Sequence, residues 1–317
     1  MNFDFDHAVH APFRMQPGLR RLATGAHQLT PAAPGSRHQR EKLAVLGAFA
    51  GQALLAEPGF DAAPALDALL AHAAREHPGH LSWDGEHALA LGVGVDAAGH
   101  VAQETPGVFG HGDEIARCLR ALPAAWRLAA LASLAFEEDF AVVDGTRGTI
   151  PWLAVALPSH WAPETKVARH FAEVHAPVAD SARLLAASDA LTRLVTGPER
   201  WERFVWTVTP HPRLHAHPAR VDGWPPTPDA ATIAAQAWWR TERQTFIALP
   251  ARRQAVFTIH VDVRPLAQAL DTPSRAAAVH DAVASMSDAV LAYRGLTAVR
   301  DPLLAWLRER AQLPDLG

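Results

Sequence analysis

His160, His170 and His175 fall within sixteen positions of the stretch "ALPSHWAPETKVARHFAEVHAPV", residues 156–178. The chain contains 18 histidines but a single cysteine, Cys118, which excludes a disulfide or a cysteine-based metal cluster within the chain. Apolar neighbours on a predicted helix favour an inert, buried thiol for Cys118. Histidine is therefore the residue type available for metal chemistry, and neutral imidazole is a suitable ligand for iron.

Prolines at 163 and 177 predict a helix over residues 163–175, because proline fits the first helical turn and disfavours helix in the residue before it. At 100° per residue, His175 shares the apolar face of Val167, Phe171 and Val174. One interpretation is a helix-terminal imidazole that is satisfied by a carbonyl. The alternative is an axial ligand that the helix presents to a haem.

The strand-like run "WWRTERQTF" carries polar residues on both faces. Alternation places Arg240, Glu242 and Gln244 on one face, and Arg243 and Thr245 on the other. Exposure to solvent explains one of these faces. If the other covers a pocket, an arginine could bind a carboxylate such as a haem propionate, and Glu242 could accept a hydrogen bond from a cationic amine.

Other candidate groups are ambiguous. The flanking prolines of "HPRLHAH" and its lack of an acidic ligand favour a solvated loop over a metal site at His211, His215 and His217. His260 lies on a strand and could line a pocket or make a structural hydrogen bond. The run Glu137–Asp139 alternates between faces, which favours a solvated or structural role over a paired acid and base.

The composition sets limits on function. The chain has 317 residues, 49% of them apolar, and a net charge of −4, so no basic surface indicates a nucleic-acid partner. The N-terminus "MNFDFDHAVHAPFR" is acidic where a signal peptide is basic, and no apolar run approaches the ~20 residues that span a bilayer. We expect a cytoplasmic protein without membrane contact. No nucleotide-binding or serine-hydrolase motif is present.

Apolar spacing and turn residues predict the elements. After an irregular arm over residues 1–35, we expect helices over residues 40–55, 62–76 and 112–136, the last broken near Pro123, and a hairpin around "DAAGH". The next predicted elements are the strands "DFAVVD" and "TIPWLAVAL", the helix over residues 163–175, and a second helix from residue 180 to "TGP". They are followed by the strands "WERFVWTVTP", "AQAWWRTERQTFIAL" and "QAVFTIHVDV" and by helices opened by "DTPSR" and "RDPLL".

Two strands, a helical insertion and three strands predict an α+β fold with a PAS-like five-stranded antiparallel sheet. The expected division is an N-terminal arm and helical region over residues 1–135, a PAS-like core over residues 136–266, and C-terminal helices over residues 267–317.

Five motifs resemble one family in the order in which they occur, over most of residues 12–266: "PFRMQPGLRRL", "FEEDF", "LPSHWAPETKVARHFAEVHAPV", "WWRTERQTFIALP" and "VFTIHVDVRPL". They are similar to the α-subunit-like proteins of haem-dependent oxidative N-demethylase, which are related to dimethylamine monooxygenase. The resemblance implies a haem domain that activates dioxygen, oxidises an N-methyl group of a small amine and releases formaldehyde.

The resemblance also implies roles for individual residues. It makes His175, in "VHAPV", the axial ligand of a non-covalent haem b, and Lys166, Arg240 and Arg243 contacts to the cofactor. Glu242 and Arg243 become the catalytic candidates. The substrate-binding candidates are Glu242, Trp206 and His260.

Electrons must come from elsewhere, because the chain has no flavin or nicotinamide fingerprint and too few cysteines for an iron–sulfur cluster. A separate flavin or iron–sulfur reductase is the expected partner. Two alternatives remain open: a haem-PAS gas or redox sensor, although no output module follows the sheet, and a non-catalytic PAS scaffold without haem.

Overall fold

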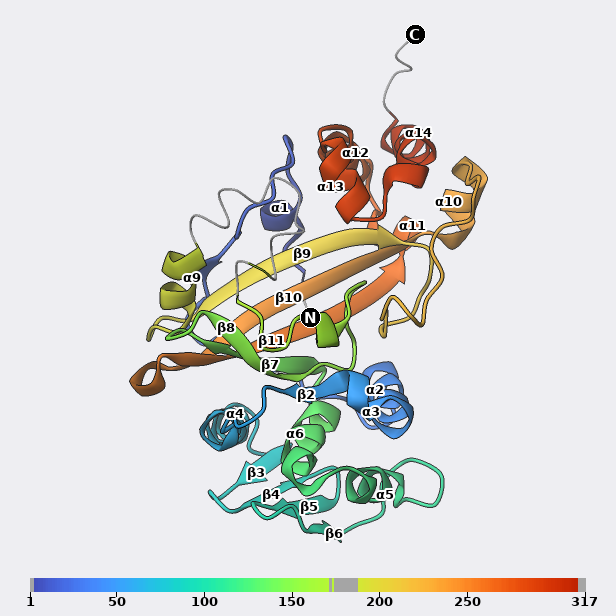
Figure 1. The fold of residues 1–317 in the computed structure, drawn as a ribbon. Coiled ribbons are helices and arrows are strands. Elements are labelled where there is room, and N and C mark those ends of the chain that lie inside the picture. The colour runs from blue at the N-terminus through green and yellow to red at the C-terminus, as the bar shows by residue number, and fades with distance from the viewer. Residues whose placement is uncertain (1–2, 171–172, 174–187, 313–317) are drawn as a thin grey trace.

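The computed structural model describes residues 3–170, 173 and 188–312, which form two antiparallel sheets with helices between and around them (Figure 1). This arrangement confirms the α+β class. The strands are β1 (Arg20–Arg21), β2 (Leu54–Ala56), β3 (Leu81–Trp83), β4 (His87–Ala90), β5 (Val93–Asp96), β6 (Val101–Gln103), β7 (Glu138–Asp144), β8 (Thr149–Ala154), β9 (Trp201–Thr209), β10 (Trp238–Leu249) and β11 (Gln254–Pro265).

The helices confirm most of the predicted helical segments. Their bounds are α1 (Phe5–Ala8), α2 (Arg37–Ala48), α3 (Ala50–Ala53), α4 (Ala63–Glu76), α5 (Glu114–Ala121), α6 (Ala124–Ala135), α9 (Ser188–Val195), α10 (Ala230–Gln236), α11 (Leu266–Ala269), α12 (Pro273–Ala284), α13 (Asp288–Tyr293) and α14 (Arg300–Ala311), with 3₁₀ turns η1 (Pro163–Thr165), η2 (Pro250–Arg252) and η3 (Thr297–Val299). The break at Pro123 falls between α5 and α6 as predicted. The helix predicted over residues 40–55 ends earlier, at Ala48.

The larger sheet has the strand order β1-β9-β10-β11-β7-β8-β2, and every neighbouring pair is antiparallel. The five predicted strands are its five central strands. The prediction of a five-stranded sheet was wrong in strand number, because β1 and β2 extend the two edges. These edge strands have two and three residues, which is too short for alternation to be visible in the sequence.

A second sheet contains β3, β4, β5 and β6. The predicted hairpin around "DAAGH" is the β5–β6 pair, and β3 and β4 extend it. The β4–β5 connection requires glycine at position 92: φ is +73°, and a Cβ there would lie 2.4 Å from Oγ1 of Thr105.

A layer of helices, α2, α4 and α6, separates the two sheets (Figure 1). Leu66, Leu69, Leu70 and Ala73 of α4 are buried at helical spacing, as expected for an amphipathic helix with one covered face. By contrast, α6 contacts β4 and β5 on one side and β7 and β8 on the other, so its apolar residues lie all round the helix.

The C-terminal helices cover another part of the larger sheet. Residues of α12, α13 and α14 share an apolar cluster with Trp206 and Val208 of β9 and Trp239 of β10. The short helix α13 was not predicted.

The helix predicted over residues 163–175 was wrong over its first part. Pro163 opens only the 3₁₀ turn η1, Ala168 has a φ of +60°, and His170 forms an antiparallel bridge with Thr149 of β8. The backbone N–H groups of Ile150 and Ala168 donate to the carbonyls of Arg169 and Ile150, respectively. Pairing with the free end of β8 therefore replaces local helix formation. His175 and most of the helix predicted from residue 180 lie outside the described residues, although α9 ends before "TGP" as expected.

Candidate functional site

The two faces of β10 carry different sets of polar side chains. In the register, Glu242 lies opposite Val205 of β9 and Gln244 opposite Arg203, while Arg243 lies opposite Phe204 and His260. Paired residues share a face and consecutive residues do not. We call the side with Arg203, Arg240, Glu242 and Gln244 the Glu242 face, and the side with Trp206, Arg243, Thr245 and His260 the Arg243 face.

Arg240 lies at one end of the Glu242 face and is 1% exposed. Its Nε donates to Oγ of Ser159 (2.8 Å), its Nη1 to the carbonyl of Arg213 (2.9 Å), and its Nη2 to the carbonyls of Leu214 (2.7 Å) and Pro158 (3.1 Å). Burial lowers the pKa of Arg240 to about 10, so the group remains a cation at neutral pH. These bonds join the segment after β8 to the loop after β9.

Glu242 and Arg203 form the centre of the Glu242 face. Nε2 of Gln244 donates to Oε2 of Glu242 (2.6 Å), and Glu242 is 8% exposed. Burial lowers the pKa of Arg203 despite the attraction of the Glu242 carboxylate. Within the described part of the chain, Nε of Arg203 is buried and has no hydrogen-bond partner.

The same side of β9 has three further polar atoms of this kind. Trp201 Nε1, Thr207 Oγ1 and Thr209 Oγ1 are all buried without a hydrogen-bond partner among the described residues. A buried donor without an acceptor costs about 1–3 kcal/mol. A row of such atoms beside the buried Nε of Arg203 fits a bound group that carries acceptors and negative charge.

His160 and His211 lie beside Arg240, with ring centroids 5.3 Å apart. Burial, followed by the charge of Arg240, lowers the pKa of His160 to about 3 and that of His211 to about 4. Both rings are therefore neutral at pH 7. The two ring nitrogens of His211 are buried and have no hydrogen-bond partner in the described ranges.

The Arg243 face is occupied by structural contacts. Arg243 donates to Oε2 of Glu202 (3.0 Å) and to the carbonyl of His27 (2.8 Å), and Arg20 also pairs with Glu202 (2.9 Å). Nε1 of Trp206 donates to the carbonyl of Ala8 (3.0 Å). The N-terminal arm thus covers this face and uses its donors.

The predicted site residues are therefore only partly brought together. Arg240 and Glu242 share a face, but Arg243, Trp206 and His260 lie on the other side of the sheet. A pocket that contains Glu242, Trp206 and His260 together is not formed, because the sheet separates them. Lys166 follows the turn η1, where burial lowers its pKa, and His175 lies outside the described residues.

Arg203 is the residue that sequence reasoning missed. It was placed on a strand, "WERFVWTVTP", without a role. The signal was its alternation with Trp201, Val205 and Thr207, which puts one arginine on a mostly uncharged face.

The other candidate groups have structural partners. His215 contacts the carbonyl of Ala156 (2.7 Å) and His217 contacts Glu164 (3.1 Å), so the three histidines of "HPRLHAH" do not converge on one point. Glu138 and Asp139 are fully buried, not solvated. Cys118 is a free, half-buried thiol, and burial raises its pKa.

The structure thus defines the class of protein as an α+β fold built on an antiparallel sheet, with one face of that sheet held by structural contacts and the other carrying polar atoms that have no partner among the described residues. The family described as haem-dependent oxidative N-demethylase, alpha subunit-like, matches residues 119–304. The match covers more than half of the 317-residue chain, so the chain belongs to this family. Haem dependence and oxidative demethylation are thus properties at the level of the family.

None of the described helices combines the length and the apolar character that a membrane-spanning helix needs.

Proposed function

We propose that this chain is the haem-binding subunit of an oxygenase that removes an N-methyl group from a small amine and releases formaldehyde. The observation that carries the proposal, in a member of this family, is the Glu242 face: the Glu242 side chain and the Nε atom of Arg203 are buried there, and polar atoms beside them have no partner among the described residues. In this proposal the five central strands form the PAS-like core.

The residues of the Glu242 face fit a haem. A non-covalent haem b would supply the iron that activates dioxygen for oxidation of the N-methyl group. Arg203 would donate to a carboxylate of the haem, since its Nε has no other acceptor among the described residues. Lys166 is a second cation proposed for cofactor binding. His175 would hold the haem iron, a role that rests on the sequence resemblance alone.

Arg240 would act as a positioning residue, because its guanidinium is engaged by four backbone carbonyls and a serine hydroxyl. Glu242 would accept a hydrogen bond from the ammonium group of the substrate and stabilise its charge. The donation from Gln244 keeps one carboxylate oxygen fixed and leaves the other for the amine. Arg243 and Trp206 lie outside this pocket in the proposal.

The chain would receive electrons from a separate flavin or iron–sulfur reductase. The alpha-subunit-like description of the family is consistent with a multi-subunit oxygenase.

An absorption spectrum of the full chain purified from haem-supplemented cells tests the cofactor. We expect a Soret band that is lost in His175→Ala. The absence of the band from the parent protein would reject both the oxygenase and a haem sensor, and would leave the scaffold.

Formaldehyde release from secondary amines in the presence of a reductant tests the reaction. We expect Glu242→Gln to retain the Soret band and to lose at least ~100-fold in kcat/KM, because the charge opposite the ammonium is removed. Glu199→Gln, at a half-exposed surface carboxylate, is the matched control. A haem spectrum without any formaldehyde would favour the sensor.

A further inference from the structure

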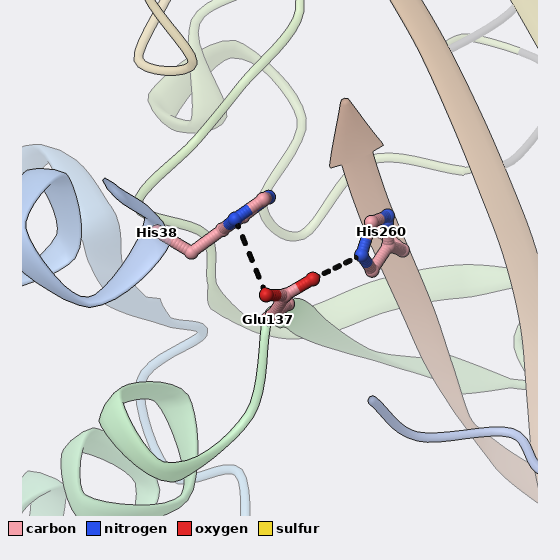
Figure 2. A group of neighbouring side chains, drawn as sticks. All are labelled: His38, Glu137 and His260. Atoms are coloured by element: carbon pink, nitrogen blue, oxygen red, sulfur yellow. Dashed lines mark hydrogen bonds and ion pairs between the residues drawn. The ribbon is translucent and has the colours of Figure 1, made fainter. Parts of the chain in front are cut away.

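Among the described residues, one group of three metal-ligating side chains converges away from the Glu242 face. His38, Glu137 and His260 place one potential ligand atom each within 4.8 Å of the others (Figure 2). His38 lies in the first turn of α2, Glu137 directly before β7, and His260 on the Arg243 face of β11. Three separate segments of the chain thus meet at one carboxylate.

The spacing of these atoms is close to that of a coordination site. Nε2 of His260 lies 2.7 Å from Oε2 of Glu137, and Nδ1 of His38 lies 3.5 Å from Oε1. Bonds of ~2.0–2.1 Å in a tetrahedral zinc site put neighbouring ligand atoms about 3.3 Å apart. Displacements of under about 1 Å would therefore admit an ion.

The tautomer of His38 is fixed by its other nitrogen. Nε2 lies 2.7 Å from the carbonyl oxygen of Val261, which can only accept, so Nε2 carries the proton. Nδ1 then directs a lone pair toward a carboxylate oxygen, an arrangement that a cation between them stabilises. Histidine ligands of metals commonly donate their second nitrogen in this way.

The side chains of His260 and Glu137 also place atoms where they could bind a metal ion. Nε2 of His260 donates to Oε2 of Glu137, while Nδ1 is buried without a hydrogen-bond partner in the described part of the chain, so an ion at Nε2 would replace the proton that Nε2 now carries. Glu137 offers one carboxylate oxygen to each imidazole: Oε2 faces Nε2 of His260 and Oε1 faces Nδ1 of His38. A carboxylate is the form in which glutamate binds a metal.

We propose that His38, Glu137 and His260 bind a divalent transition-metal ion of the zinc type, distinct from the haem iron. Two imidazoles and one carboxylate suit zinc better than calcium or magnesium, which prefer oxygen ligands. Side-chain exposures of 11% for His38 and 18% for Glu137 give the ion a route from solvent and leave room for a water ligand. The ion would link three elements: α2 through His38, the start of β7 through Glu137, and β11 through His260.

The test uses the full chain with any haem that it carries. After dialysis against a chelator, the protein is equilibrated with zinc chloride, and zinc and iron are counted separately by elemental emission. We expect one zinc per chain, and X-ray absorption at the zinc edge that shows two imidazole ligands. Zinc near zero per chain, or a coordination shell without imidazole, would overturn the proposal.

Variants connect the zinc to these residues. Glu137→Gln and His260→Gln should weaken zinc binding by at least about 10–100-fold, the loss typical even of an outer-shell change. His217→Gln is the matched control, because His217 is also buried against a carboxylate but has no third ligand beside it. If circular dichroism shows that both variants are folded and their zinc affinity is unchanged, Glu137 and His260 are not zinc ligands. If His260→Gln does not fold, the near-isosteric Glu137→Gln decides.

Discussion

The two faces of β10 differ in how completely their polar groups are used. On the Arg243 face, Arg243, Arg20 and Glu202 satisfy one another, and Trp206 donates to the N-terminal arm. On the Glu242 face, the polar side chains contributed by β9 all have a buried atom without a partner in the described part of the chain. The exceptions on the Arg243 face, among the described residues, are Nδ1 of His260, which belongs to the proposed metal site, and Oε1 of Glu138, which lies opposite His260 on β7.

This contrast separates structural polar groups from groups that are available to a ligand. Arginine occurs in both environments: Arg243 has two firm acceptors, while the Nε of Arg203 has none among the described residues. A buried polar group without a partner is destabilising unless something binds it. The partners of an arginine, and not its presence in a strand, therefore indicate its role.

The largest effect on stability is expected from Arg240→Met. The substitution removes the donors to the carbonyls of Arg213 and Leu214 and to Oγ of Ser159, while the carbonyl of Pro158 keeps the N–H of Ala216, so the free energy of unfolding should fall by about 3–5 kcal/mol. Urea unfolding measures the change. Arg264→Met, at an exposed arginine on the neighbouring strand, should change it by under about 0.5 kcal/mol. Equal stabilities would show that Arg240 does not brace the Glu242 face.

The Arg243 face should be sensitive to acid through Glu76. Burial raises the pKa of Glu76, but hydrogen bonds from His72 and from the backbone N–H groups of Gln28 and Leu29 lower it to about 2. Gln28 in turn donates to Thr245 on the Arg243 face.

A lowered pKa in the folded state means that the contribution of Glu76 is complete above its unfolded pKa of about 4.3 and is lost as the pH falls toward 2. The stability advantage of the parent protein over Glu76→Gln should therefore decrease by roughly 3 kcal/mol between pH 5 and pH 2. Urea midpoints of both proteins across this range measure it. A stability advantage that is independent of pH would show that the hydrogen bonds of the Glu76 carboxylate do not stabilise the folded state.

Glu202→Gln tests the matched network on the Arg243 face. Glu202 is 6% exposed, and its carboxylate is shared by Arg20 and Arg243. Removing this charge should lower the free energy of unfolding by about 2–3 kcal/mol. The expected value is at the low end for a buried pair because Arg20 is one-third exposed. Haem content should remain that of the parent protein, and a loss of haem from a folded variant would extend the cofactor site to this face.

Arg203→Met should have the smallest effect on folding and a clear effect on the cofactor. In the haem-free protein, unfolding free energy should change by under about 1 kcal/mol, because Nε of Arg203 has no acceptor to lose among the described residues. Haem titration followed at the Soret band should show affinity reduced by about 10-fold or more, as expected for a lost charged hydrogen bond. Unchanged affinity would remove Arg203 from the proposed pocket.

Much of the larger sheet could be predicted from the sequence, because its central strands have visible alternation and clear turns. The same alternation correctly placed Glu242 and Arg243 on opposite faces. The sequence could not show that the N-terminal arm covers the Arg243 face, since the contacts of Arg243 with His27 and of Trp206 with Ala8 join segments that are far apart in the chain.

The prediction of a helix from residue 163 was wrong over residues 163–170 for a related reason. Its prolines and apolar spacing are local signals, whereas the pairing of His170 with Thr149 is a tertiary contact. The group of His38, Glu137 and His260 was equally hidden, because only the folded chain brings α2, β7 and β11 together.

The pairing of β1 with β9 also sets an order of events during synthesis. Arg20 bonds to Glu202 across 182 residues of sequence, so the N-terminal arm has no partner strand until most of the chain has been made. At ~5–20 residues per second, that delay is about 10–40 s, far longer than a hairpin needs to form. The arm therefore leaves the ribosome well before its partner strand exists, and reaches its native position late.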